Sequence, residues 1–227
     1  ENASHPGFDA RSVALAAHSC SLYRTWGLTD IGQVGHDIAH IHVSDKGHLG
    51  QCRIHAEDYQ LDSLGVVVEL YGLGKALHKA VAQRKQISWY CPNQVAAVEQ
   101  QQDRVVVSLS KGQQISGALM AIAEGANSPT RSLLGIDRQV TPYGQSAVIA
   151  NIRTNQSHQG WAYERFTQHG PLALLPLPDT DNANNSNRCS LVWTIQDEQR
   201  DRVMSLSDEA FLSELQQAFG YRLGMFT

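Results

Sequence analysis

Four segments in the second half of the chain are rich in apolar residues and follow one another with no helical pattern between them. Runs of this length, alternating in polarity or apolar throughout, are typical of β-strands. We therefore predict successive, mostly antiparallel strands at 146–152, 161–166, 172–177 and 189–195. The period then changes, because the apolar residues at 211, 212, 215 and 219 recur at helical spacing. With a serine cap at Ser207 and a glycine at Gly220, the segment is predicted to be an amphipathic helix.

The first half of the chain mixes the two periods. Residues 8–27 are predicted to form a loop that runs into a helix ending at Gly27. The apolar side of this helix is formed by Val13, Leu15, Ala16, Leu22 and Trp26. Residues 38–55 alternate instead, and predict two strands joined by a turn at 45–47.

The middle of the chain continues this mixture. The segment 66–82 predicts a short strand and then a helix, with Glu69 near the helix start. A negative charge suits the helix dipole there, so capping is a sufficient explanation for Glu69. Further strands are predicted at 87–91, 94–99 and 104–109, followed by a turn at 111–112.

The segment 118–131 holds the most informative pattern. Residues 118–123 are all apolar, which predicts a strand buried on both faces. Glu124 and Gly125 follow, and Ser128-Pro129 then has the residue types of a helix start, with Gly135 placed to end that helix. Open α/β sheets bind ligands at such junctions, because backbone N–H groups and the helix dipole converge there. An ordinary strand–loop–helix junction has the same pattern, so these residues alone leave both interpretations open.

Composition narrows the classes of function. The 227 residues are 42% hydrophobic and 18% charged, with a net charge of -4, which suits a globular protein and gives no general attraction for nucleic acid. No apolar run approaches the roughly 20 residues of a membrane helix, and the first residues do not resemble a secretory signal. The four cysteines are scattered without a C-x-x-C pair, which favours free thiols. We therefore expect a cytoplasmic protein, either free or peripheral to the membrane.

Three histidines near residue 40 suggest a metal site at first sight. They are His36, His40 and His42. Only residues two apart share a face of a strand, and no nearby carboxylate or cysteine completes a ligand set. We expect exposed strand histidines and no metal site.

The segment 118–131 resembles the Asp-Gly fingerprint of the FAD-dependent aromatic hydroxylases, the p-hydroxybenzoate hydroxylase-like flavoprotein monooxygenases. Gly125, Ser128 and Arg131 fit that fingerprint, and Glu124 stands where the family has aspartate. Longer strings resemble one branch of the family, the 2-octaprenyl-6-methoxyphenol hydroxylases of ubiquinone biosynthesis. They include 42–48, 142–151 and 164–176, and the resemblance covers essentially the whole chain.

The resemblance implies a cofactor, a reductant and a substrate: FAD, NAD(P)H and a polyprenylated phenol that receives one oxygen atom from O2. A ubiquinone-biosynthesis complex is implied as a further partner. By position, Arg11 matches an arginine that approaches the FAD pyrophosphate, Glu69 matches a position beside the cofactor, and Glu124-Gly125 matches the Asp-Gly pair. The strand that passes the flavin ring and the substrate cavity corresponds to 170–176. Its implied substrate-binding residues are Gly170, Pro171, Leu172 and Leu174. No residue is implied as a catalytic acid, base or nucleophile.

The departures from the family predict an incomplete enzyme. The G-x-G-x-x-G motif that opens the family and its later Gly-Asp motif are missing from the sequence. We therefore expect an interior fragment that neither binds FAD tightly nor hydroxylates by itself.

The expected fold class is α/β with α+β character. An incomplete, Rossmann-like FAD-binding portion is predicted at 1–37 and 66–137, and a mostly antiparallel substrate-binding portion at 38–65 and 138–227. Two alternatives stay open for the function. One is a flavin-family dehydrogenase or reductase without hydroxylation, and the other is a non-enzymatic lipid-binding or assembly module on the same fold.

Overall fold

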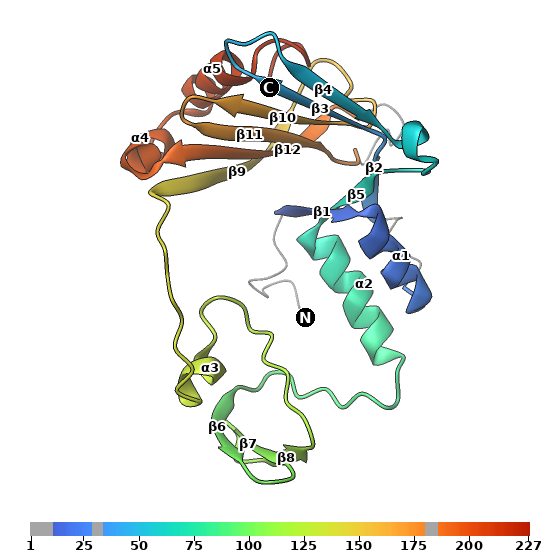
Figure 1. The fold of residues 1–227 in the computed structure, drawn as a ribbon, viewed down its shortest axis with the longest axis vertical. Helices are drawn as coiled ribbons and strands as arrows, with labels where there is room; N and C mark the ends of the chain where they lie inside the picture. The colour runs from blue at the N-terminus through green and yellow to red at the C-terminus, as the bar shows by residue number, and fades with distance from the viewer. Residues whose placement is uncertain (1–10, 29–33, 180–185) are drawn as a thin grey trace. The chain divides into compact units, whose positions relative to one another are not determined.

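The computed structural model describes residues 11–28, 34–179 and 186–227. These residues form a mixed α/β fold with three sheets, as predicted for the fold class (Figure 1). Contacts divide the chain into two compact units, Glu1–Arg84 with Tyr143–Thr227, and Lys85–Pro142. Within the described ranges, no helix has the length and apolar character needed to cross a membrane.

A six-stranded sheet forms most of the first unit, in the order β4-β3-β10-β11-β12-β9. β10 runs parallel to β3, and the other neighbours are antiparallel. The strands are β3 (His40–Asp45), β4 (Gln51–His55), β9 (Gln145–Arg153), β10 (Trp161–Thr167), β11 (Gly170–Pro176) and β12 (Arg188–Gln196). The sheet therefore joins a hairpin from the first quarter of the chain to strands from its last two-fifths.

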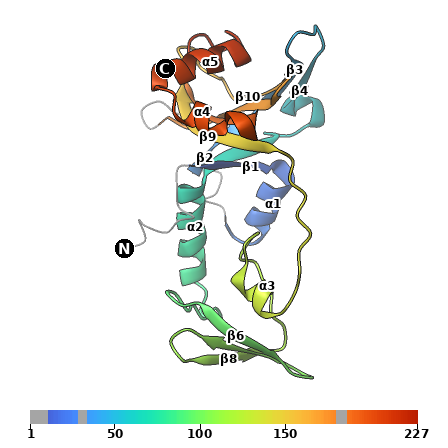
Figure 2. The same cartoon turned by 90° about the vertical axis from the view of Figure 1, so that its left-hand side faces the viewer.

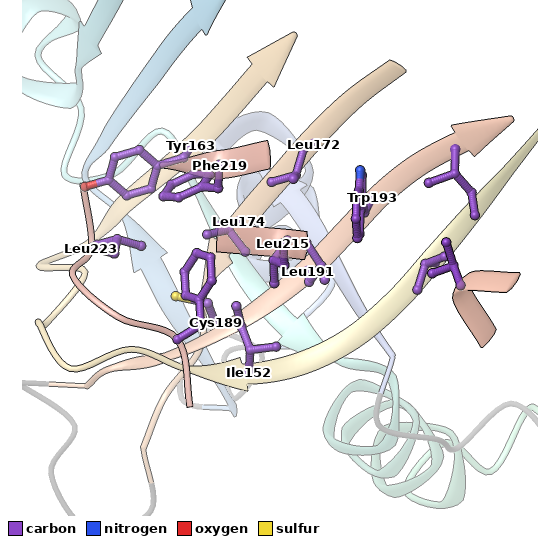
Figure 3. Close-up of a cluster of buried hydrophobic side chains, with 14 residues drawn as sticks. Ile152, Tyr163, Leu172, Leu174, Cys189, Leu191, Trp193, Leu215, Phe219 and Leu223 are labelled. Carbon is purple, nitrogen blue, oxygen red and sulfur yellow. The ribbon is translucent and has the colours of Figure 1, made fainter. Parts of the chain in front are cut away.

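Helix α5 (Asp208–Phe219) covers one face of this sheet. Its buried residues Leu215 and Phe219 belong to the same hydrophobic cluster as Leu172, Leu174 and Trp193 of the sheet (Figure 3). The Ser207 hydroxyl caps the helix by accepting a hydrogen bond from the Ala210 N–H. Two shorter helical segments, η4 (Asp197–Gln199) and α4 (Arg200–Met204), connect β12 to α5.

A three-stranded antiparallel sheet, in the order β1-β5-β2, forms the rest of the first unit. Its strands are β1 (Ser12–Ala16), β2 (Gly35–Ile38) and β5 (Gly65–Glu69). Helices α1 (Ala17–Thr25) and α2 (Leu70–Ala82) pack on the face that carries Val66 and Val68, and both lie below the three-stranded sheet in Figures 1 and 2. The intervening Val67 faces the other way and joins a cluster with Ala162 and Leu177 of the six-stranded region. The short helix η2 (Ala56–Tyr59) links β4 to the segment before β5.

The second unit contains a small antiparallel sheet and one short helix. The strands β6 (Val95–Gln100), β7 (Val105–Leu109) and β8 (Gln114–Gly117) pair in sequence order. Helix α3 (Pro129–Leu133) contacts β6. The connection between β8 and α3 carries Glu124 and Gly125.

Most of the predicted elements are confirmed. The four strands of the second half, the 38–55 hairpin, the strand–helix segment 66–82 and the C-terminal helix all form. Gly27, Gly112 and Gly135 have positive φ at the ends or turns predicted for them.

Three predictions are wrong in whole or in part. The helix predicted within 8–27 forms as α1, but Val13, Leu15 and Ala16 lie in β1 instead, because they pair with Val68, Val66 and Gly65 of β5. Residues 87–91 are not a strand. The segment 118–123 forms no strand and is mostly exposed, with Leu119 88% exposed. No described strand lies beside it to bury its apolar side chains.

Candidate functional site

Glu69 ends β5 and stands at the N-cap position of α2, but its side chain does not cap the helix. Its Oε1 instead accepts a hydrogen bond of 2.6 Å from Nη2 of Arg188, which begins β12. Both side chains are about three-quarters buried, so this ion pair links the three-stranded sheet to the six-stranded one. The interpretation of Glu69 as a helix cap is therefore wrong. Arg11 lies beside it in the backbone, since the Leu70 N–H donates to the Arg11 carbonyl at 2.8 Å.

Glu124 uses both carboxylate oxygens within its own loop. They accept hydrogen bonds from the Ser128 hydroxyl, from the Thr130 N–H at 3.1 Å and from the Thr130 hydroxyl at 2.7 Å. These bonds lower the pKa of the Glu124 carboxyl, with the Ser128 bond contributing most. Ser128 in turn caps α3, as predicted, by accepting from the Arg131 N–H. Gly125 has φ +81°, a conformation that glycine adopts without strain.

The four predicted cofactor residues fall into two groups. Arg11 and Glu69 come together in the first unit, whereas Glu124 and Gly125 belong to the second. That the two groups act on one cofactor stays a prediction.

The donor chemistry of these residues fits FAD in part. Arg11 is exposed, and a guanidinium suits an anionic pyrophosphate. The carboxylates of Glu69 and Glu124 only accept hydrogen bonds, and each is already bonded to protein groups. Carboxylates of this kind suit sugar hydroxyls rather than phosphates. The set therefore offers one phosphate-binding cation and no glycine-rich loop.

The predicted substrate strand is β11, and its residues alternate between two faces of the sheet. Leu172 and Leu174 are fully buried under α5 (Figure 3). Pro171 points to the opposite face, and Gly170 approaches β12 so closely that an added Cβ would lie 3.0 Å from Thr194. Whether any of the four residues binds substrate stays a prediction.

The face of the six-stranded sheet opposite to α5 is called the open face. It carries a row of residues that pair directly from strand to strand. The row crosses β3, β10, β11, β12 and β9 as Val43, Glu164, Ala173, Val192 and Ile149. Four of the five are apolar, and Ile149 is 46% exposed. Glu164 was not predicted as a site residue. The signal for it was a single acid within the apolar strand 161–166.

Glu164 is half-buried and has no hydrogen-bond or ion-pair partner in the described ranges of the chain. Burial raises the pKa of its carboxyl. An unpaired carboxylate in an apolar setting costs folding free energy. Such a group is a natural acceptor for a hydroxyl donor supplied by a ligand.

The histidines of β3 are less exposed than predicted, because the register turns them toward the α5 side next to Trp161 and Tyr163. His42 is 2% exposed, and burial lowers its pKa. The Nδ1 atoms of His40 and His55 lie 2.9 Å apart. Among the residues described, no cluster of three potential metal ligands is found.

His158 is a buried histidine on the loop before β10. Burial, and then the nearby His36, lower its pKa to about 4. Its Nε2 donates to the Leu177 carbonyl and its Nδ1 accepts from the Gly160 N–H, each at 3.2 Å. The neutral ring thus satisfies two backbone groups and serves the fold.

Comparison with known proteins gives relatives of one kind. Ubiquinone hydroxylase UbiL of Rhodospirillum rubrum is 31% identical over 224 residues, covering 96% of this chain and 49% of that protein. The 3-demethoxyubiquinol 3-hydroxylase of Escherichia coli is 27% identical over 220 residues, covering 96% of this chain and 54% of its own length. The chain thus spans about half the length of these curated relatives. No protein-family model matches the chain.

The fold recurs in a solved structure with low sequence identity. PqsL of Pseudomonas aeruginosa, a probable FAD-dependent monooxygenase, superposes with a TM-score of 0.75 at 16% identity, covering 98% of this chain and 63% of that one. This likeness confirms the predicted fold class.

Proposed function

We propose that this chain, a homologue of the flavin-dependent hydroxylases of ubiquinone biosynthesis, belongs to an enzyme that hydroxylates a polyprenylated phenol with FAD, NAD(P)H and O2. The observation that carries the proposal is the 31% identity to a ubiquinone hydroxylase along 96% of the chain. The relatives' names supply the substrate class, and the fold is one that PqsL also adopts.

The residues of this chain bind and orient the reactants in this proposal. FAD, when bound and reduced by NAD(P)H, supplies the activated oxygen. Arg11 would bind its pyrophosphate, and the ion pair with Arg188 holds the Glu69 carboxylate in place. The open face of the six-stranded sheet receives the phenol and excludes water from one side of the ring.

The location of the enzyme follows from its substrate. A prenyl tail partitions into the bilayer, because each buried CH2 contributes about 0.8 kcal/mol. We therefore place the protein in the cytoplasm, in peripheral contact with the membrane and with an assembly of ubiquinone-biosynthesis enzymes.

Purification of the protein that carries this chain tests the proposal. We expect bound flavin and O2 uptake that matches formation of a hydroxylated product from a prenylated phenol. Uptake of O2 that yields hydrogen peroxide without this product would identify a reductase. A protein without flavin that still binds prenylated lipids would identify a binding or assembly module.

A further inference from the structure

Glu164 is the one charged side chain in the row that crosses the open face. Its direct neighbours are Val43 on β3 and Ala173 on β11, and the row continues through Val192 to Ile149. The carboxylate is half-buried and lacks a partner in the described part of the chain. A row that combines one hydrogen-bond acceptor with an apolar path matches an amphiphile that carries one donor at its head.

The opposite ends of the open face differ in how they are covered. At the end near Ala162, residues of the three-stranded sheet pack on it through Val67 and Ile38. Two residues further along β10, Glu164 lies beyond that cluster. In the same direction, Phe166 is 50% exposed. Glu164 therefore stands at the boundary between covered and open surface, where a ligand can reach it.

The dimensions of the row suit a tail as well as a ring. Neighbouring strands lie about 4.8 Å apart, so the path from Glu164 on β10 to Ile149 on β9 crosses three spacings, or about 14 Å. All three residues along that path after Glu164 are apolar. A ring hydroxyl at Glu164 thus places a prenyl tail along Ala173, Val192 and Ile149.

We propose that Glu164 accepts a hydrogen bond from the phenol hydroxyl of the substrate and thereby fixes the ring on the open face, with the prenyl tail along the row. This inference rests on the proposed function and adds a specific residue to it. When the hydroxyl proton moves closer to the carboxylate, more electron density is left on the phenol oxygen and its ring. Orientation of the ring does not require transfer of the proton to Glu164.

The folding cost of the unpaired carboxylate supports this role. A half-buried charge without a partner destabilises the fold, so replacing it with a neutral side chain should raise the free energy of unfolding. We expect Glu164→Leu and Glu164→Gln to fold at least as stably as the wild type. A loss of ligand preference in these variants is then not an effect of unfolding.

Binding of two matched probes tests the inference. The probes are 2-geranylphenol and its methyl ether, 2-geranylanisole, which has the same tail and no hydroxyl donor. Calorimetric titration of the chain is expected to show a preference for the phenol of about tenfold or more, as one hydrogen bond to a charged group supports. The preference should fall to about one in Glu164→Leu and to an intermediate value in Glu164→Gln, whose amide oxygen is an uncharged acceptor. Glu57→Gln, an exposed acid on η2, is the control and should keep the wild-type preference.

Two outcomes overturn the inference in different ways. If the wild type binds both probes equally well, the carboxylate plays no part, while the proposed function stands because the tail is still bound. If the wild type binds neither probe, the open face is not the substrate site, and the placement fails together with the residue assignment.

Discussion

Replacement of Leu172 by alanine separates a core role from a substrate-binding role for β11. Leu172 is fully buried in the cluster under α5 and pairs across the sheet with Trp193. Leucine-to-alanine changes in such cores cost about 2–5 kcal/mol, because the cavity that remains collapses only in part. With a urea m-value of about 2 kcal/mol/M, the unfolding midpoint should fall by about 1–2.5 M.

Urea titration followed by tryptophan fluorescence measures this shift. Leu119→Ala is the control, since that side chain is 88% exposed and its loss should change stability by less than about 0.5 kcal/mol. The reasoning is refuted if Leu172→Ala lowers the midpoint by less than about 0.3 M, well below the expected shift. A simultaneous tenfold loss of affinity for 2-geranylphenol would then show that the side chain serves the ligand.

Three further predictions concern other parts of the chain. Because the pKa of His158 is lowered to about 4, the unfolded chain binds a proton below its ordinary value near 6.5 while the folded one does not. Stability should therefore fall as pH drops from about 6.5 to 4, and His158→Gln should flatten this slope in urea titrations. Glu124→Ala should expose the start of α3 and speed amide hydrogen exchange at Thr130, and unchanged exchange would contradict the capping role of Glu124. In the native protein the stabilisation from the Glu124 carboxylate is present above the ordinary glutamate pKa and is lost as pH falls through the lowered pKa of the folded state. The chain by itself should not retain FAD in gel filtration, because Arg11 is its single assigned phosphate-binding cation; a yellow peak with near-stoichiometric flavin would show otherwise.

Elements whose signals are local in the sequence could be predicted correctly. Predictions failed where pairing with distant segments determines the secondary structure. The helix at 208–219 carries its own cap, period and terminator, and it formed as predicted. Val13 and Leu15 also fit a helical period, but pairing with β5, some 50 residues away, makes them a strand. The apolar run 118–123 has the composition of a buried strand, yet composition cannot supply the neighbours that bury it.

In the candidate site too, the sequence indicated individual residues, whereas their contacts depend on the fold. Residue types and a family resemblance selected Glu69 and Glu124, but not what their carboxylates bind. The partner of Glu69 is Arg188, 119 residues later in the chain, and only the fold brings the two together. The apolar string 170–176 predicted a strand, but not which of its side chains α5 would cover. Glu164 stood out only after the register had placed apolar residues on both sides of it.

Isotope labelling measures the central claim most directly. The protein that carries this chain, with flavin bound, is supplied with NAD(P)H, 2-geranylphenol and oxygen-18 gas, and the product is analysed by mass spectrometry. The account predicts one oxygen-18 atom in the new ring hydroxyl and none when the label is in water instead. A hydroxyl oxygen that comes from water, or consumption of O2 without a hydroxylated ring, would contradict assignment to the flavin monooxygenases.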